Sequence, residues 1–132
     1  MKLEPPGGAE TFETTYSTMW FDENNILCSV SRKNAVITKE TLDHSFNMIR
    51  IRAKGEKVCW IGDVTNITSA DKEARDYAAN ETPKFIKALA LITNSPLSRM
   101  VANIFLNLKK LPFPVKMFTS EEEARNWIAK YL

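Results

Sequence analysis

A predicted central strand at positions 57–64, apolar from Val58 to Ile61, is the feature that most restricts the fold of this chain. It combines β-branched and aromatic residues, stops at Gly62-Asp63, and passes through a Thr/Ser loop into a helical pattern over residues 70–78. This pattern is typical of a buried strand that feeds a helix. At such a junction, free backbone N–H groups and short polar side chains meet at one edge of the sheet. The run therefore predicts an α/β fold with a candidate binding site at this edge.

Strands and helices alternate along the rest of the chain. Residues 12–21 and 26–31 predict two antiparallel strands joined by a polar turn, and two more strands are predicted at 88–93 and 115–118. Helices are predicted over residues 38–53 and from Thr68 or Ser69, Ser95 and Ser120 onward, because capping residues there precede apolar residues at helical spacing. The order β-β-α-β-α-β-α-β-α predicts an α/β fold with a mixed, mostly parallel sheet packed by helices.

Length and charge indicate one ordinary globular domain. The chain has 132 residues, of which 44% are apolar, so it can bury a core without disulfide or metal staples. Residues 1–11 contain paired prolines and glycines and are expected to form a flexible tail before a domain at 12–132. The net charge is +2 and the basic runs are short, so nucleic acid is not an expected partner.

Cysteine usage and apolar runs indicate the compartment. Cys28 and Cys59 lie inside apolar strand patterns, where a free thiol packs as a small hydrophobic group; a disulfide or a functional thiol is the less favoured alternative. Residues 1–10 lack the apolar region of a secretory signal, and no apolar run approaches the roughly 20 residues of a membrane span. A cytoplasmic protein without a membrane span is expected.

Three segments carry a resemblance to a known family. Residues 62–65 (Gly-Asp-Val-Thr), 114–118 and 121–128, together with the element order, resemble a SpoIIAA-like, or STAS-like, domain over residues 12–131. In anti-anti-sigma factors of that family, a strand end is followed five residues later by Asp-Ser-Ser-Gly, whose second serine is phosphorylated. Residues 71–74 here are Asp-Lys-Glu-Ala, so Glu73 stands at the phosphoacceptor position. The resemblance implies a scaffold that binds proteins or apolar small molecules without the usual phosphorylation switch.

Four polar residues form the candidate binding edge after the central strand: Asp63, Thr65, Thr68 and Ser69. The first N–H groups of the next helix could hold an anion such as phosphate beside them. The simpler interpretation is that Thr68 or Ser69 caps its own helix while Asp63 accepts hydrogen bonds from loop amides. Phosphorylation of Thr68 or Ser69 is a further alternative, because a helix start stabilises negative charge.

The helix that begins at Ser95 carries the widest apolar band. Met100, Ile104, Phe105 and Leu108 form a candidate surface for a hydrophobic ligand or a partner. The alternatives are a cavity wall, a docking face, contact with a second copy of the chain, and ordinary core packing.

The sequence contains no motif for catalysis, a metal or a cofactor. His44 is the single histidine and is expected on the surface. The sequence therefore predicts a non-enzymatic regulatory or protein-interaction module that forms a homodimer and takes no cofactor. The alternative is a binding protein for a small apolar or lipid-like ligand.

Overall fold

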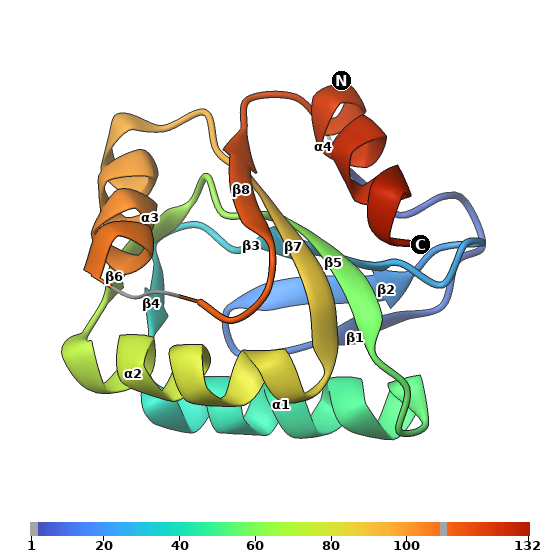
Figure 1. Ribbon diagram of the computed structural model, residues 1–132, viewed down its shortest axis with the longest axis horizontal. Coiled ribbons are helices and arrows are strands. Elements are labelled where there is room, and N and C mark those ends of the chain that lie inside the picture. Colours follow the sequence, from blue (N-terminus) through green and yellow to red (C-terminus); the bar gives the residue numbers. More distant parts are fainter. Residues whose placement is uncertain (1–2, 109–110) are drawn as a thin grey trace.

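The computed structural model describes residues 3–108 and 111–132, without the side chains of residues 105–108. Its centre is a six-stranded sheet in the order β1-β2-β3-β5-β7-β8 (Figure 1). These strands are β1 (Thr11–Glu13), β2 (Ser17–Phe21), β3 (Leu27–Ser31), β5 (Val58–Asp63), β7 (Ile86–Ile92) and β8 (Val115–Phe118). β1, β2 and β3 pair antiparallel, whereas β3, β5, β7 and β8 pair parallel, so β3 belongs to both parts. This confirms the predicted mixed, mostly parallel sheet.

A second sheet of two parallel strands was not predicted. It pairs β4 (Ala35–Ile37) with β6 (Ile67–Ala70). β6 occupies the residues that were expected to begin a helix, so the predicted helix start at Thr68 or Ser69 is wrong. The Thr68 hydroxyl donates to a main-chain carbonyl of β4 at 3.1 Å, which supports the extended conformation here.

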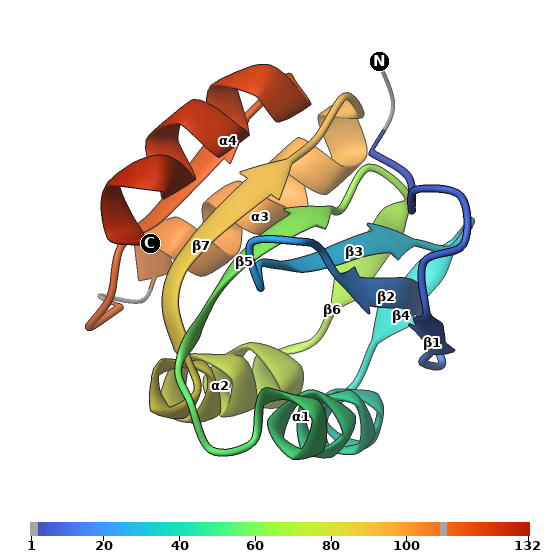
Figure 2. The ribbon, with the colours of Figure 1, turned by 90° about the vertical axis from the view of Figure 1, so that its right-hand side faces the viewer.

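Helices pack on both faces of the large sheet. α1 (Lys39–Ala53) and α2 (Lys72–Glu81) lie side by side on one face, and α4 (Glu121–Ile128) lies on the other (Figure 2). α3 (Pro96–Leu108) follows β7 and packs beside β6. Short 3-10 turns follow α2 at Thr82–Lys84 and α4 at Ala129–Tyr131.

The N-terminal strand is divided in two, so the prediction of one strand over 12–21 is wrong. β1 and β2 pair with each other, and Phe12 lies opposite Met19. Between them, the Thr14 hydroxyl accepts a hydrogen bond from the N–H of Ser17 at 3.0 Å and so closes a turn. In the segment before β1, Leu3 is only 3% exposed and packs in the core.

Side-chain caps set the starts of the helices, as predicted for three of the four. Thr38 forms a capping box at α1, Ser95 accepts from the N–H of Ser98 at α3, and Ser120 accepts from the N–H of Glu123 at α4. At α2, which starts later than predicted, the Asp71 carboxylate accepts from the N–H of Ala74 at 2.8 Å. These acceptors satisfy N–H groups that the first helical turn leaves unpaired.

The large sheet separates two apolar clusters. The first, on the side of α1 and α2, includes Phe46, Ile49, Trp60 and Leu89. The second, on the side of α4, includes Trp20, Cys28, Ile61, Ala90 and Ile128. We call the first side the cavity face, because it borders a cavity. We call the second side the α4 face. Alternating residues of each strand supply the two clusters because successive side chains point to opposite faces of a sheet.

Candidate functional site

A cavity of about 160 Å³ lies on the cavity face. It is bounded by the large sheet, the small sheet and helices α1, α2 and α3, and it borders the apolar cluster of this face. Its wall is largely apolar. Apolar residues of the wall include Leu42 and Phe46 of α1, Trp60 and Leu89 of the sheet, Ala74 and Ala78 of α2, and Val101 and Ala102 of α3.

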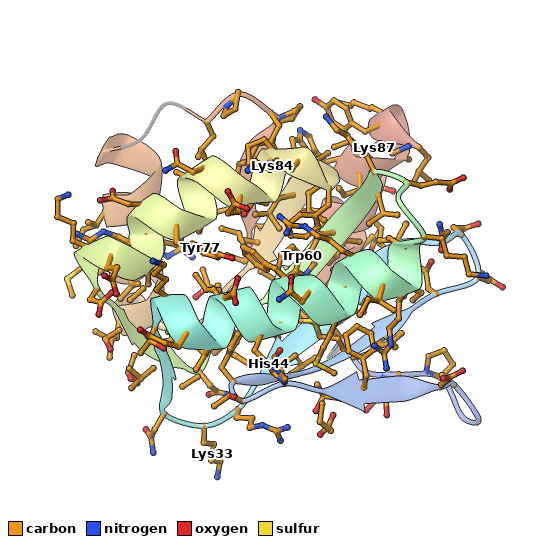
Figure 3. All side chains as sticks on the ribbon, turned by 90° about the horizontal axis from the view of Figure 1, so that it is seen from below. Lys33, His44, Trp60, Tyr77, Lys84 and Lys87 are labelled. Carbon is orange, nitrogen blue, oxygen red and sulfur yellow. The ribbon has the colours of Figure 1, made fainter. Side chains whose placement is uncertain are left out.

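Aromatic contacts hold the wall in place. The Phe46 ring lies edge-on to Trp60, with centroids 6.2 Å apart, and stacks on Tyr77 at 5.8 Å. Figure 3 shows Trp60 and Tyr77 in the space between α1 and α2, seen from below. Tyr77 also donates a hydrogen bond to the Asp43 carboxylate of α1 at 2.5 Å. Burial is the largest cause, and this hydrogen bond the next, of a pKa of Tyr77 that is raised to about 12. The two helices are thus joined beside the cavity wall by rings and by one charge-assisted hydrogen bond.

Three buried serines supply a polar side of the wall. Ser17, Ser29 and Ser31 lie on adjacent strands β2 and β3, face the cavity, and are at most 6% exposed. The indole N–H of Trp60 donates to Ser29 Oγ at 2.9 Å, and the backbone N–H of Asn66 donates to Ser31 Oγ at 3.2 Å. The cavity therefore combines a large apolar wall with a few oxygen groups, a composition typical of small-molecule sites.

Gly62 gives the wall its open space beside Ser29. A Cβ atom at this position would lie 3.1 Å from Ser29 Oγ and 3.4 Å from Trp60 Nε1. The first distance is short for a carbon and the second is at the edge of ordinary contact, so a side chain here would crowd the Ser29 hydroxyl first. Glycine at position 62 thus leaves room for the Ser29 hydroxyl and the Trp60 indole in the cavity wall.

The charged groups on the rim of the cavity are held by main-chain groups. Asp63 Oδ1 accepts from the N–H of Thr65 at 2.9 Å, which bears out the simpler interpretation of Asp63 as an acceptor for loop amides. The guanidinium of Arg75 donates to the carbonyl of Ala70 at 2.7 Å. Rim residues such as Ile67 and Val101 are half-buried, so the cavity approaches the surface beside β6 and α3.

The four residues of the predicted binding edge serve separate parts of the structure. Asp63 lines the cavity, and the Thr65 hydroxyl accepts from the N–H of Asn94 at 3.2 Å. Thr68 contacts β4, as described above, and Ser69 is exposed on β6. Glu73, at the position that matches the phosphoacceptor, is exposed in the first turn of α2.

The apolar band of α3 divides between the cavity and the surface. Met100 and Ile104 are 54% and 41% exposed, and Leu97 beside them is 44% exposed. Ala102 and Val101, on another side of the helix, line the cavity. The side chains of Phe105 and Leu108, the other two members of the predicted surface, lie outside the described residues.

Comparisons with known proteins place the chain in a family. Residues 19–132 match the model of a protein family described as "Domain of unknown function (DUF7793)". The chain belongs to this family. A comparison with curated proteins gives no match. The family match spans every wall residue of the cavity except Tyr16 and Ser17.

Solved structures resemble the fold. An uncharacterized protein of the DUF3478 family with a SpoIIAA-like fold, from Shewanella loihica PV-4, is 17% identical, with 96% of this chain and 98% of that chain covered and a TM-score of 0.55. A protein with unknown function from Arthrobacter sp. FB24 is 24% identical, with 84% and 97% covered and a TM-score of 0.32. The first similarity confirms the SpoIIAA-like fold that the sequence predicted.

Other polar groups lie away from the cavity. His44 is exposed on α1, as predicted (Figure 3). Cys28 and Cys59 are free and buried, which confirms them as core thiols, and burial raises the pKa of Cys28 to about 12. Among the described residues, no three His, Cys, Asp or Glu side chains are grouped to hold a metal ion. None of the described helices is long and apolar enough to cross a membrane.

Proposed function

We propose that this protein is a non-catalytic module that binds a small apolar ligand in the cavity. The observation that carries the proposal is an apolar space of about 160 Å³ between the sheets and helices α1, α2 and α3. Protein interiors are close-packed, and voids larger than a water molecule are few in a domain. A cavity of this size loses dispersion contacts along its wall, so a molecule that fills it would recover them.

The size of the cavity limits the size of the ligand. An engineered protein cavity of about 150 Å³, lined by Leu, Ile and Phe, stays dry and binds benzene. The present cavity is similar in volume and has Leu42, Phe46 and Leu89 in its wall. The proposed ligand is therefore about as large as one six-membered ring with a small substituent, much smaller than a membrane lipid.

The proposal assigns binding and no reaction. The two charged groups on the rim, Asp63 and Arg75, are held by main-chain partners rather than by each other. Cys28 and Cys59 both belong to the opposite cluster, away from the described cavity wall. Glu73 has no hydroxyl, which supports a role without phosphorylation at the position used in anti-anti-sigma factors. Two free buried thiols suit the cytoplasmic location that we propose.

Binding of toluene tests this function. We expect toluene to raise the melting temperature and to shift NMR signals of the wall methyl groups of Leu42 and Leu89, because a ligand that binds only the folded state stabilises it. Ala74→Leu fills the cavity from α2 and should abolish both effects. Ala79→Leu makes the same change on the same helix outside the cavity wall, and should leave them intact. Equal responses in all three proteins, or none in the wild type, would contradict the proposal.

A second function, protein association, is supported by the exposed side of α3. Leu97, Met100 and Ile104 are each more than 40% exposed and lie within two turns of one helix. Exposed apolar patches of this kind often mark contact surfaces, and a second copy of the chain is the partner that we propose.

Sedimentation tests the association. We expect the wild-type protein to sediment as a dimer at micromolar concentration and Met100→Glu to sediment as a monomer, because a carboxylate in the centre of the patch would be desolvated by the contact. Asn103→Glu places the same charge on an exposed position of α3 and serves as the control. A wild-type protein that is monomeric throughout would remove this second function and leave ligand binding untouched.

A further inference from the structure

The hydroxyl of Ser29 is one of the buried polar groups in the cavity wall. Ser29 is 6% exposed and lines the cavity between Trp60 and Gly62. Since Gly62 has no side chain, nothing of residue 62 covers this hydroxyl on the cavity side.

The direction of its hydrogen bond is fixed by chemistry. An indole N–H can donate but cannot accept, so in the 2.9 Å contact with Trp60 the oxygen of Ser29 is the acceptor. The hydroxyl hydrogen of Ser29 remains, and no hydrogen bond donated by it is found among the described atoms, which leave out the side chains of residues 105–108. A buried donor without an acceptor is costly, and groups in this state often serve a ligand.

Two other buried hydroxyls near the cavity face differ in this respect. Ser45 donates to the carbonyl of Leu42 at 3.1 Å and pairs with the Tyr16 hydroxyl at 2.9 Å. Ser17 pairs with the Thr14 hydroxyl at 2.7 Å. These two hydroxyls find partners within the protein, whereas the hydrogen of Ser29, like that of Ser31, is available to a molecule in the cavity.

We propose that the ligand carries a neutral carbonyl oxygen that accepts a hydrogen bond from Ser29. This inference rests on the proposed ligand function and specifies its chemistry: a small apolar ketone, aldehyde or ester. An anionic ligand fits less well because Asp63, the residue after Gly62, belongs to the wall of the same cavity and carries a negative charge. A pure hydrocarbon would fill the space but leave the Ser29 hydrogen without an acceptor.

Two probes of equal shape isolate this hydrogen bond. Cyclohexanone and methylenecyclohexane differ only by the exchange of a carbonyl oxygen for a CH₂ group. The quantity to measure is the ratio of their dissociation constants, obtained by calorimetry, because a change of cavity size affects both probes alike.

The protein variants must also remove the indole donor. In Ser29→Ala alone, the N–H of Trp60 would lose its acceptor and turn into a new donor for the ligand. We therefore compare Trp60→Phe, which keeps the Ser29 hydroxyl, with Trp60→Phe/Ser29→Ala, which lacks it. The affinity for cyclohexanone relative to methylenecyclohexane should be about five- to tenfold lower in the double variant.

The outcomes separate this inference from the function on which it rests. If both probes bind and the ratio is the same in the two variants, apolar binding stands and the assignment of Ser29 is wrong. If neither probe binds the wild-type protein, the ligand function fails and this inference fails with it. Should the Trp60→Phe variants not fold, infrared spectra of cyclohexanone bound to the wild type decide the matter. A carbonyl band at lower wavenumber than in an alkane supports the hydrogen bond, and an unshifted band contradicts it.

Discussion

On the α4 face of the sheet, Ile61 and Ile128 are completely buried and pack in one continuous cluster. On the cavity face, Leu42 and Leu89 belong to a cluster of similar composition, yet they also border an empty space of about 160 Å³. None of the residues of the second cluster lines that cavity. Both faces use the same strands, so the difference arises from the helices: α4 is short and packs directly on the sheet, whereas α1, α2 and α3 surround a gap.

This difference implies a division of roles. A closely packed face contributes stability through every methyl group that it buries. A face with a cavity gives up part of that contribution in exchange for a binding space. Stability should therefore depend more on the α4 face and ligand binding more on the cavity face, and the following three predictions test or refine this contrast.

Core truncation on the two faces should give the largest effect. We expect Ile61→Ala, on the α4 face, to lower the free energy of unfolding by about 4 kcal/mol, since it leaves a new void among fully packed neighbours. Ile37→Ala, in the cavity wall, should cost only about 2 kcal/mol, because Ile37 already borders empty space. Urea denaturation measures both values. A larger loss for Ile37→Ala would reverse the contrast.

Alkaline pH should weaken the cavity face through Tyr16. Burial raises the pKa of Tyr16 to about 12, despite the opposing hydrogen bond with Ser45, whereas an exposed tyrosine titrates near 10. Below pH 10 both states keep the proton, so the contribution is constant. Between pH 10 and 12 the unfolded state releases the proton and the folded state retains it, so the free energy of unfolding falls as pH rises.

The matching measurement is urea denaturation at several pH values from 9 to 12. The wild-type protein should lose about 2 kcal/mol more stability over this range than Tyr16→Phe, whose side chain has no proton to release. Parallel stability curves for the two proteins would mean that Tyr16 ionises freely, and hence that the cavity admits water next to its ring.

Much of this architecture could be predicted from local sequence signals. Thr38 and Ser120 mark helix starts because a side-chain cap acts within three residues, and the buried run before Asp63 marks the central strand. The start of α2 was predicted three or four residues too early because Thr68 has the same capping chemistry as a true cap, but its hydroxyl contacts Ala35, more than 30 residues away. Short strands such as β4 carry too few residues for a periodic signal.

The cavity could not be predicted from the sequence, for a different reason. Its volume depends on how far apart three helices and two sheets settle, and a difference of one methylene in packing would fill part of it. The available signals were indirect: Ser29 and Ser31 alternate along a strand that is otherwise apolar, and Gly62 interrupts the central strand. Serines that face the core, opposite a glycine in the neighbouring strand, are a pattern that could be sought in related chains.

Removal of Arg125 should give the smallest effect and tests how α4 is attached to its face. The Arg125 guanidinium donates to Asp22 at 2.9 Å and to Glu121 at 2.7 Å, and so ties α4 to the β2–β3 turn. Burial opposes its charge, but the hydrogen bonds to Glu121 and Asp22 prevail and raise the pKa of Arg125. Arg125→Met keeps the aliphatic chain and removes these donors.

We expect Arg125→Met to lower the free energy of unfolding by about 1 kcal/mol, which urea denaturation can resolve. The loss stays small because the Asp22 carboxylate, although its side chain is 9% exposed, keeps hydrogen bonds from the N–H groups of Asn24 and Ile26. Lys130→Met, an exposed position just after α4, removes the same charge without a partner and should have no measurable effect. If Arg125→Met cost as much as Ile61→Ala, the α4 face would owe its stability to an ion pair rather than to close packing, and the contrast between the two faces would need a different physical basis.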